Sequence, residues 1–381
     1  MQCKIIVSKN SSLYSAIEEI DRQYEVEMGI DGYDFLLIAL SPHYPTYDIN
    51  ETIARFFDPE KVCAFHALDS FCNEQIISHG ITALFIKFER KGSISYFIQE
   101  EIGNRQIERL EQTADYLKSH HDAQHIIIGG LCSNRFAFFI EKLNHYDIPV
   151  DNLIGGISSG NTFAEEALTY QFHNGQIIKD GFIILSFHNV SMSTEISTGF
   201  VPIGVQYTVT KANGYKIFEV DESQSFLYTI EKLTRDIEEF KPEYLWYTPL
   251  VIIKDQSEEL ITLRTFKEMG DGWVEFYGPV KEGQKIKLSY GESTHLLKAD
   301  RESAYKLAET LPEPELLFNF SCIARQYVLE DHQCEENQMY RNYLHAPLFG
   351  FFTFGEIGHD EGKKSLQFYN ETSLLIGVAE K

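Results

Sequence analysis

Short and nearly uninterrupted apolar runs constrain the fold of this chain more than any other feature of its sequence. Phe35 to Leu40 contains no polar side chain, and Phe182 to Phe187 contains one. A strand with one face in water would alternate apolar and polar residues, whereas a continuous run is typical of a strand that is covered on both faces. We therefore expect sheets with other layers packed against both of their faces.

Helical segments alternate with predicted strands through the first 157 residues. A helix can begin at Ser11 or Ser12 and run through Ile17 and Ile20, whose spacing is helical. Further strands are expected over residues 3–7, 34–40, 62–68, 81–88, 125–130 and 152–157, and further helices over 50–57, 107–118 and 135–143. This β-α-β rhythm predicts α/β layering.

The pattern becomes richer in strands after residue 168. Asn174-Gly175 joins two alternating segments and suits the tight turn of a β-hairpin. Strands are expected over residues 193–211, 261–266, 273–276, 285–288, 316–320, 349–354 and 374–378, and helices over 224–240, 302–311 and 336–344. The final run, Leu374 to Val378, does not alternate, so we expect it inside a sheet and not at an edge.

One strand-rich unit closes and another opens between residues 200 and 222. No Pro-rich or Ser-rich linker marks this point, so the two units are expected to pack together. The predicted fold is mixed α/β (α+β), with two packed domains that each hold a mixed sheet covered by helices.

The chain is strongly acidic. It has 33 Lys and Arg against 57 Asp and Glu, a formal net charge of -24. This charge argues against nucleic acid or an anionic membrane face as a partner. Solubility explains the acidity, and a surface that meets a basic partner is the alternative.

The sequence favours a cytoplasmic protein without membrane insertion. Its longest apolar stretches fall far short of the ~20 residues of a membrane span, and the N-terminus lacks a signal peptide. The six cysteines are widely and irregularly spaced, which is typical neither of a zinc site nor of a disulfide framework.

Two charged residues in the C-terminal third adjoin apolar strands. Arg325 follows the run that ends at Cys322, and Glu356 follows an aromatic strand. Such a pair can hold the two ends of an amino acid, or it can form a structural ion pair. Cys322 has no partner base in the sequence, so a small buried residue is its default role and a nucleophile the weaker alternative.

Other polar and glycine-rich positions lie near predicted strand ends. Asn370 and Thr372 open the last strand, and Gly155-Gly156 belongs to a glycine-rich segment that ends at Gly160. That segment lacks the dinucleotide fingerprint, so it is either a tight loop at the edge of a pocket or a plain turn.

Two histidines have apolar neighbours, His66 in VCAFHAL and His188 in ILSFHN. Each can face a cofactor from a pocket wall. The alternative for each is a hydrogen-bonded histidine of the core or of a strand end.

Several segments together resemble the FIST family of sensory domains. The C-terminal part of that family typically has the pattern f-s-C-x-x-R, then G-F-y-t-y-G-E-I-G, then h-N-x-T. The corresponding residues here are Cys322 with Arg325, then Gly350 to Gly358, then Asn370 with Thr372. Residues 199–204 (GFVPIG) and 209–212 (VTKA) are similar to two further elements of the family. The resemblance divides the chain into a FIST N-like domain over residues 1–210 and a FIST C-like domain over 211–381.

The resemblance implies an intracellular sensor of a small ligand without catalysis. One branch of the family binds haem, senses nitric oxide and controls a partner histidine kinase. For that branch, His188 and His66 are the candidates for the axial ligand. The ligand is otherwise a small polar metabolite such as an amino acid, bound by Cys322, Arg325, Glu356, Asn370, Thr372, Gly155 and Gly156. The alternatives are a small-molecule enzyme that uses Cys322 or Glu356, and an interaction scaffold without a ligand.

Overall fold

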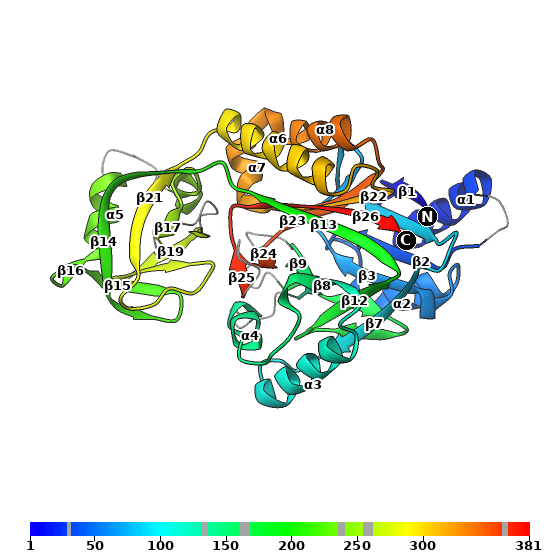
Figure 1. Cartoon of the computed structure of the whole chain (residues 1–381), viewed down its shortest axis with the longest axis horizontal. Helices are drawn as coiled ribbons and strands as arrows, with labels where there is room; N and C mark the ends of the chain where they lie inside the picture. The colour runs from blue at the N-terminus through cyan, green and yellow to red at the C-terminus, as the bar shows by residue number, and fades with distance from the viewer. Residues whose placement is uncertain (29–31, 131–135, 161–167, 235–240, 254–261, 360–364) are drawn as a thin grey trace.

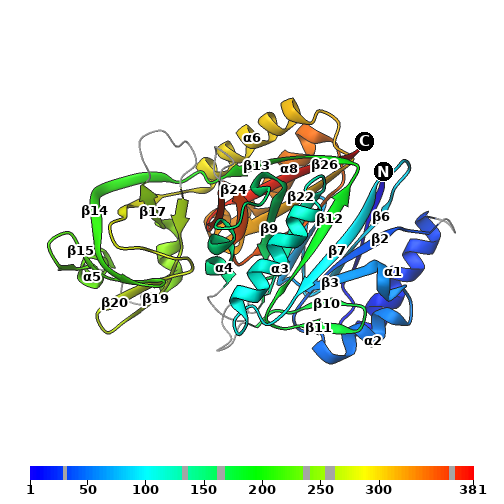
Figure 2. The same cartoon turned by 60° about the horizontal axis from the view of Figure 1, so that its bottom comes forward.

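Three six-stranded sheets surround one apolar core (Figures 1 and 2). The computed structural model describes residues 1–28, 32–130, 136–160, 168–234, 241–253, 262–359 and 365–381. Each sheet contributes a row of large apolar side chains to the core, among them Leu37 from the first sheet, Ile126 from the second and Phe318 from the third. These rows come from the continuous apolar runs of the sequence.

The first sheet is built by the N-terminal part of the chain. Its order is β1 (Gln2–Ser8), β6 (Ile81–Lys87), β2 (Phe35–Leu40), β3 (Val62–His66), β10 (Gln171–His173) and β11 (Gln176–Ile178). Helices α1 (Leu13–Met28) and α2 (Ile49–Ala54) pack on its outer face. The predicted hairpin is present, because β10 and β11 pair across Asn174 and Gly175, which both have positive φ.

The second and third sheets combine strands from both ends of the chain. The second has the order β25 (Leu366–Tyr369), β24 (Glu356–His359), β9 (Leu153–Ile157), β8 (Gln124–Gly129), β12 (Phe182–His188) and β7 (Ser93–Gln99). The third has the order β13 (Val190–Ser197), β26 (Ser373–Glu380), β22 (Leu316–Cys322), β23 (Leu348–Thr353), β4 (Asp69–Cys72) and β5 (Gln75–Ser78). As predicted, the final strand lies inside its sheet, between β13 and β22.

Each of these two sheets also carries helices on its outer face. Helices α3 (Gln106–Ser119) and α4 (Phe136–Leu143) cover the second sheet, and α6 (Ser293–Thr310) and α8 (Gln333–Leu344) cover the third. Helix α6 begins earlier than the expected start at residue 302. Glu292 precedes it without a side-chain cap, so the sequence carries no start signal there.

Residues 201–290 form a separate unit beside the three sheets (Figure 1). Its strands are β14 (Val201–Asn213), β15 (Lys216–Val220), β16 (Gln224–Ser225), β17 (Leu250–Ile253), β18 (Thr262–Arg264), β19 (Phe266–Gly270), β20 (Trp273–Phe276) and β21 (Lys285–Tyr290). Helix α5 (Phe226–Thr234) packs on them. We call this part the side unit. The expected domain division at residue 210 falls inside β14 and stays a prediction.

The predicted fold class is confirmed, since the chain is a mixed α/β protein with several mixed sheets. No helix in the described part of the chain combines the length and the apolar character that crossing a bilayer requires.

We expect Phe318→Ala to destabilise the protein by about 3–5 kcal/mol, because it opens a cavity in the common core. Phe318 is fully buried and its ring contacts those of Phe187, Phe320 and Phe349. Tyr228→Ala, at a side chain that is 57% exposed, is the control and should change stability by less than about 1 kcal/mol. Urea unfolding followed by circular dichroism measures both, and equal effects would contradict the common core.

Candidate functional site

The three sheets each contain one pair of parallel strands, and the carboxyl ends of these pairs meet at one end of the core. The pairs are β2 with β3, β8 with β9, and β22 with β23. Hydrogen bonds join the sheets at this end. Leu68 N donates to Ser159 Oγ over 3.0 Å, and Gln171 Nε2 donates to Ser158 Oγ over 3.1 Å. Ligands of α/β proteins bind most often at the carboxyl ends of strands.

The inner faces of the sheets change from apolar to polar at this end. Strand pairing and the alternation of side chains place eight buried residues on the inner faces at this end, on the same side of each strand as the apolar side chains of the core. They are Ser70, Thr82, Ser158, Gln171, Cys322, Thr353, Glu356 and Thr372. We call this set the polar end. Buried polar groups are costly unless they are hydrogen-bonded or bind something, so their concentration at one place marks a candidate site.

Glu356 lies at the centre of the polar end and is fully buried. It opens β24 opposite Gly156 of β9. One carboxylate oxygen accepts a hydrogen bond from Thr353 Oγ1, and the other accepts from Thr372 Oγ1 over 2.7 Å. Burial raises the pKa of Glu356 to about 8, although both threonines oppose the shift.

Gly155 and Gly156 lie inside β9 and allow the close approach of other strands. A Cβ on Gly155 would lie 1.9 Å from the carbonyl oxygen of Ile127, and one on Gly156 would lie 2.8 Å from Thr353 Cγ2. Gly155 therefore lets β9 lie close to β8, and Gly156 lets Thr353 approach β9, which are packing roles beside the site.

Glu371 is a second buried acid at this place, and the sequence analysis missed it. It has a positive φ of 59° and is fully buried between Asn370 and Thr372. Its Oε1 accepts a hydrogen bond from Thr265 Oγ1 of the side unit over 2.8 Å. Among the described residues, neither its Oε2 nor Oδ1 of Asn370 has a hydrogen-bond partner. Burial, reinforced by the charge of Glu356, raises the pKa of Glu371 to about 8.

Cys322 lies near both acids and is also buried. Burial raises the pKa of its thiol well above the usual value, and the charges of Glu356 and Glu371 raise it further. The side chain packs with Trp246 and Tyr277 of the side unit. The side unit therefore covers the polar end from outside.

Arg264 brings a buried cation to the boundary between the side unit and β25. Its Nε donates to the carbonyl of Pro279 over 2.9 Å, and one terminal nitrogen donates to Phe368 O over 3.0 Å. No carboxylate of the described residues forms an ion pair with it, and burial lowers its pKa to about 10. Burial raises the pKa of Tyr215, although the charge of Arg264 opposes the shift, and its hydroxyl has no hydrogen-bond partner among the described residues.

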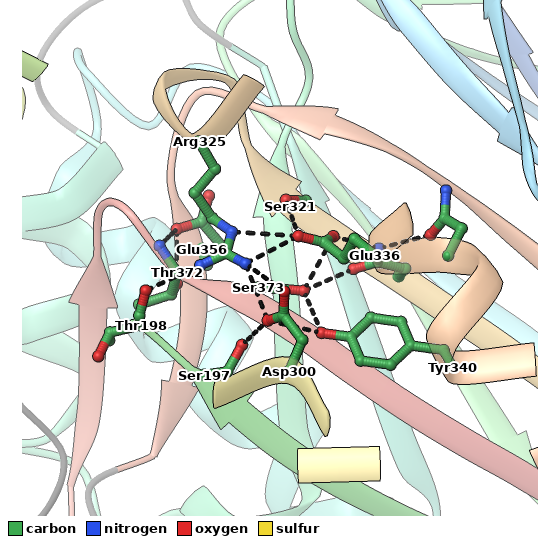
Figure 3. A network of polar contacts seen from close by, with 12 residues as sticks. Ser197, Thr198, Asp300, Ser321, Arg325, Glu336, Tyr340, Glu356, Thr372 and Ser373 are labelled. Atoms are coloured by element: carbon green, nitrogen blue, oxygen red, sulfur yellow. Dashed lines mark hydrogen bonds and ion pairs between the residues drawn. The ribbon is translucent and has the colours of Figure 1, made fainter. Parts of the chain in front are cut away.

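Arg325 lies beside Glu356 and Thr372 in Figure 3, but its ion pairs are with two other carboxylates. One terminal nitrogen lies 2.8 Å from both carboxylate oxygens of Asp300 and 2.8 Å from Glu336 Oε2. The other donates to the carbonyl of Thr198 over 2.9 Å. Burial disfavours the charged guanidinium, but the two carboxylates outweigh burial and raise its pKa above the usual value. Arg325 thus pairs with Asp300 and Glu336 and not with Glu356.

Hydrogen bonds satisfy the two carboxylates of this network as well. Asp300 accepts from Ser197 Oγ and from Tyr340 Oη, and Glu336 accepts from Asn319 Nδ2 over 2.6 Å. Arg325 therefore takes part in a structural ion network, with Asp300 and Glu336 in place of the predicted partner Glu356. Asp300 and Glu336 were not predicted from the sequence. Each lies on the buried face of its helix, where buried residues recur every four positions: Leu296, Asp300 and Ala304 on α6, and Glu336, Tyr340 and Leu344 on α8.

Neither candidate haem ligand points into the polar end, although His66 is the last residue of β3. His66 extends from the outer face of β3 and packs against the rings of Tyr170 and Phe172, on the side of α1 and α2. His188 ends β12 at the opposite end of that strand, and its Nε2 is engaged with Ser95 Oγ at 2.9 Å.

Comparison with known proteins identifies the family. The family model described as "FIST N domain" matches residues 34–223, and the model described as "FIST C domain" matches residues 226–359. This chain belongs to the FIST family. FIST domains are sensory domains of signal transduction. The FIST chain is also 33% identical over 265 residues to an uncharacterized protein of Aquifex aeolicus (strain VF5), which covers 67% of this chain and 96% of that protein.

We expect Arg325→Ala to destabilise this FIST protein by roughly 3–5 kcal/mol, because it leaves Asp300 and Glu336 buried without a cation. Arg301→Ala, at an exposed position of the same helix as Asp300, is the matched control and should have little effect. Denaturant unfolding measures the difference. A small loss in Arg325→Ala would show that the network does not stabilise the fold.

Glu371→Gln should remove a contribution of Glu371 that lowers the free energy of unfolding as pH rises. The pKa of Glu371 is about 8 in the folded chain against an ordinary 4.5, so unfolding releases a proton between these pH values. Wild-type stability then falls as pH rises from 4.5 to 8, and the variant lacks this contribution, which reaches up to about 5 kcal/mol. Thermal melts should show equal stability at pH 4.5 and a more stable variant at pH 8. Parallel pH profiles would contradict the raised pKa.

Proposed function

We propose that this FIST protein senses a small metabolite that carries an ammonium group and binds it at the polar end without catalysis. One observation carries the proposal: Glu356 and Glu371 are two fully buried acids near each other, and no cation among the described residues forms an ion pair with either. Arg325 forms its ion pairs with Asp300 and Glu336, and its charge lowers the pKa values of Glu356 and Glu371 less than burial raises them.

An ammonium group supplies what this arrangement lacks. It brings three hydrogen-bond donors and a positive charge. Oε2 of Glu371 and Oδ1 of Asn370 are buried acceptors that no donor of the described part of the chain satisfies. Binding would satisfy these acceptors and favour the ionised carboxylates, so the cost of burying them would fall when the ligand is present.

The side unit offers a route from the ligand to a signalling partner. Thr265 donates to Glu371, and Arg264 donates to Phe368, which lies two residues before Asn370. A ligand at Glu371 would change the bond to Thr265 and so the seating of the side unit. We propose that a separate signalling protein, such as a histidine kinase, responds to that change.

The arrangement does not favour an enzyme that uses Cys322 or Glu356. A cysteine nucleophile acts as the thiolate and needs a base or a cation beside it. Cys322 instead lies near two acids that raise the pKa of its thiol. We therefore propose that it packs against the side unit and takes no part in catalysis.

Haem is the second ligand that the family suggests. His66 and His188 do not fit an axial ligand at the polar end, because His66 faces the α1 and α2 layer and His188 lies at the far end of β12. The two buried acids favour a small polar cation over a large apolar macrocycle.

We expect at least one free amine to raise the melting temperature of the full chain by several degrees, since ligand binding stabilises the folded state. The screen is thermal unfolding at pH 7.5 with the twenty amino acids, putrescine and ethanolamine, each compared with its N-acetylated form, which lacks the charge. The response should be lost in Glu371→Gln and kept in Glu309→Gln, at an exposed position. A response to N-acetylated compounds alone, or an unchanged response in Glu371→Gln, would contradict the proposal.

An absorption spectrum separates haem from this proposal. We expect no Soret band that survives removal of free haem after reconstitution. A stable band that nitric oxide shifts would favour haem instead, and its loss in His66→Ala or His188→Ala would identify the ligand.

A further inference from the structure

A shallow pocket on the outer side of the first sheet lies apart from the polar end. It forms between helix α1 and the chain that follows α2, and its volume is about 460 Å³. The lining residues are four aromatic side chains, two acids and one glycine: Tyr24, Tyr33, Phe56, Phe57, Asp21, Glu25 and Gly32. We call it the α1 pocket.

Aromatic rings line most of the α1 pocket. The rings of Tyr24 and Tyr33 are nearly perpendicular, with centroids 5.7 Å apart, and Tyr33 meets Phe57 edge to face at 6.2 Å. Phe85 packs behind them, stacked on Tyr24 at 4.3 Å, so the rings are held from the sheet side. Rings fixed in this way present faces that attract a cation.

Two carboxylates stand at the side of the pocket. Asp21 and Glu25 are four residues apart on α1, so they lie on one face of the helix. Glu18 is exposed on the same face, one turn before Asp21. Burial and the charge of Glu25 both raise the pKa of Asp21.

Three basic residues lie nearby: Arg22 is exposed on α1 beside Asp21, and the other two have partners within the chain. Arg55 is bound to Glu51, and the Lys61 ammonium donates to the carbonyl of Tyr33. That ammonium also lies 5.7 Å from the centroid of the Tyr33 ring, so this ring already carries one cation contact within the chain.

We propose that the α1 pocket receives the cationic side chain of a lysine on a partner protein. Aromatic faces with adjacent carboxylates match an ammonium group on an alkyl stem, since the stem packs on the rings and the charge meets the acids. The net charge of -24 attracts a basic partner at long range.

The shape of the pocket favours a partner's side chain over a free metabolite. Asp21, Tyr33 and Phe56 are only half-buried, and Glu25 and Gly32 are exposed. A free small molecule usually loses about 70–90% of its surface to its site. A side chain that enters from a docked surface needs only this shallow depth, because the partner covers the rest.

Saturation-transfer NMR with the full chain tests the pocket directly. The probes are N-acetyl-lysine N-methylamide and its neutral counterpart N-acetyl-norleucine N-methylamide. We expect the lysine probe to bind at least about tenfold more tightly. The double variant Asp21→Asn/Glu25→Gln should lose this preference, whereas Glu111→Gln/Asp115→Asn, an exposed acid pair with the same spacing on α3, should keep it.

Three results would overturn the inference. Equal binding of both probes would show an apolar pocket without charge recognition. An unchanged preference in Asp21→Asn/Glu25→Gln would place the cation elsewhere on the acidic surface. Choline that binds more than tenfold more tightly than the lysine probe would make this a site for a free ammonium compound and not for a partner. Circular dichroism of both double variants confirms that they fold.

Discussion

The rest of the structure depends on the buried ion network around Arg325, which joins helices α6 and α8 to the segment that leads into the side unit. Asp300 belongs to α6 and Glu336 to α8, while Thr198 precedes β14, where the chain leaves the three sheets for the side unit. The chain returns from the side unit through α6. The Arg325 guanidinium therefore binds both the segment that leads into the side unit and the helix that follows it. A buried cation between two carboxylates tolerates little displacement, because each lost bond leaves a charge without compensation. The side unit is thereby fixed above the polar end.

The polar end and the Arg325 network use the same residue types for opposite purposes. Around Arg325 every carboxylate faces a cation or a hydrogen-bond donor, which makes the network rigid and closed. At Glu356 and Glu371 the chain supplies hydroxyl donors but no ion pair. The positive φ of Glu371 adds a backbone conformation that glutamate seldom adopts. Strain and unsatisfied polar atoms at one place are expected of a site that waits for a ligand.

Local patterns in the sequence predicted much of the fold, and long-range pairing escaped them. Continuous apolar runs identified β2, β12 and the interior position of β26, because burial on both faces leaves a trace in composition. The pairing of β4 with β23 left no such trace, since register between distant strands depends on the assembled core. The site followed the same rule. Glu356 stood out beside an aromatic strand, but Glu371 was hidden between Asn370 and Thr372, and the partners of Arg325 came from two helices that are remote in sequence.

The mixing of early and late strands in the second and third sheets has a consequence for folding. During synthesis, a chain that has completed the first sheet still lacks β22, β23 and β26. The apolar inner faces of its strands therefore cannot yet pack against the third sheet. Contacts between such distant segments form slowly, and exposed strand edges invite pairing with other chains. This architecture should therefore make the nascent protein depend on chaperones more than its folded stability would suggest.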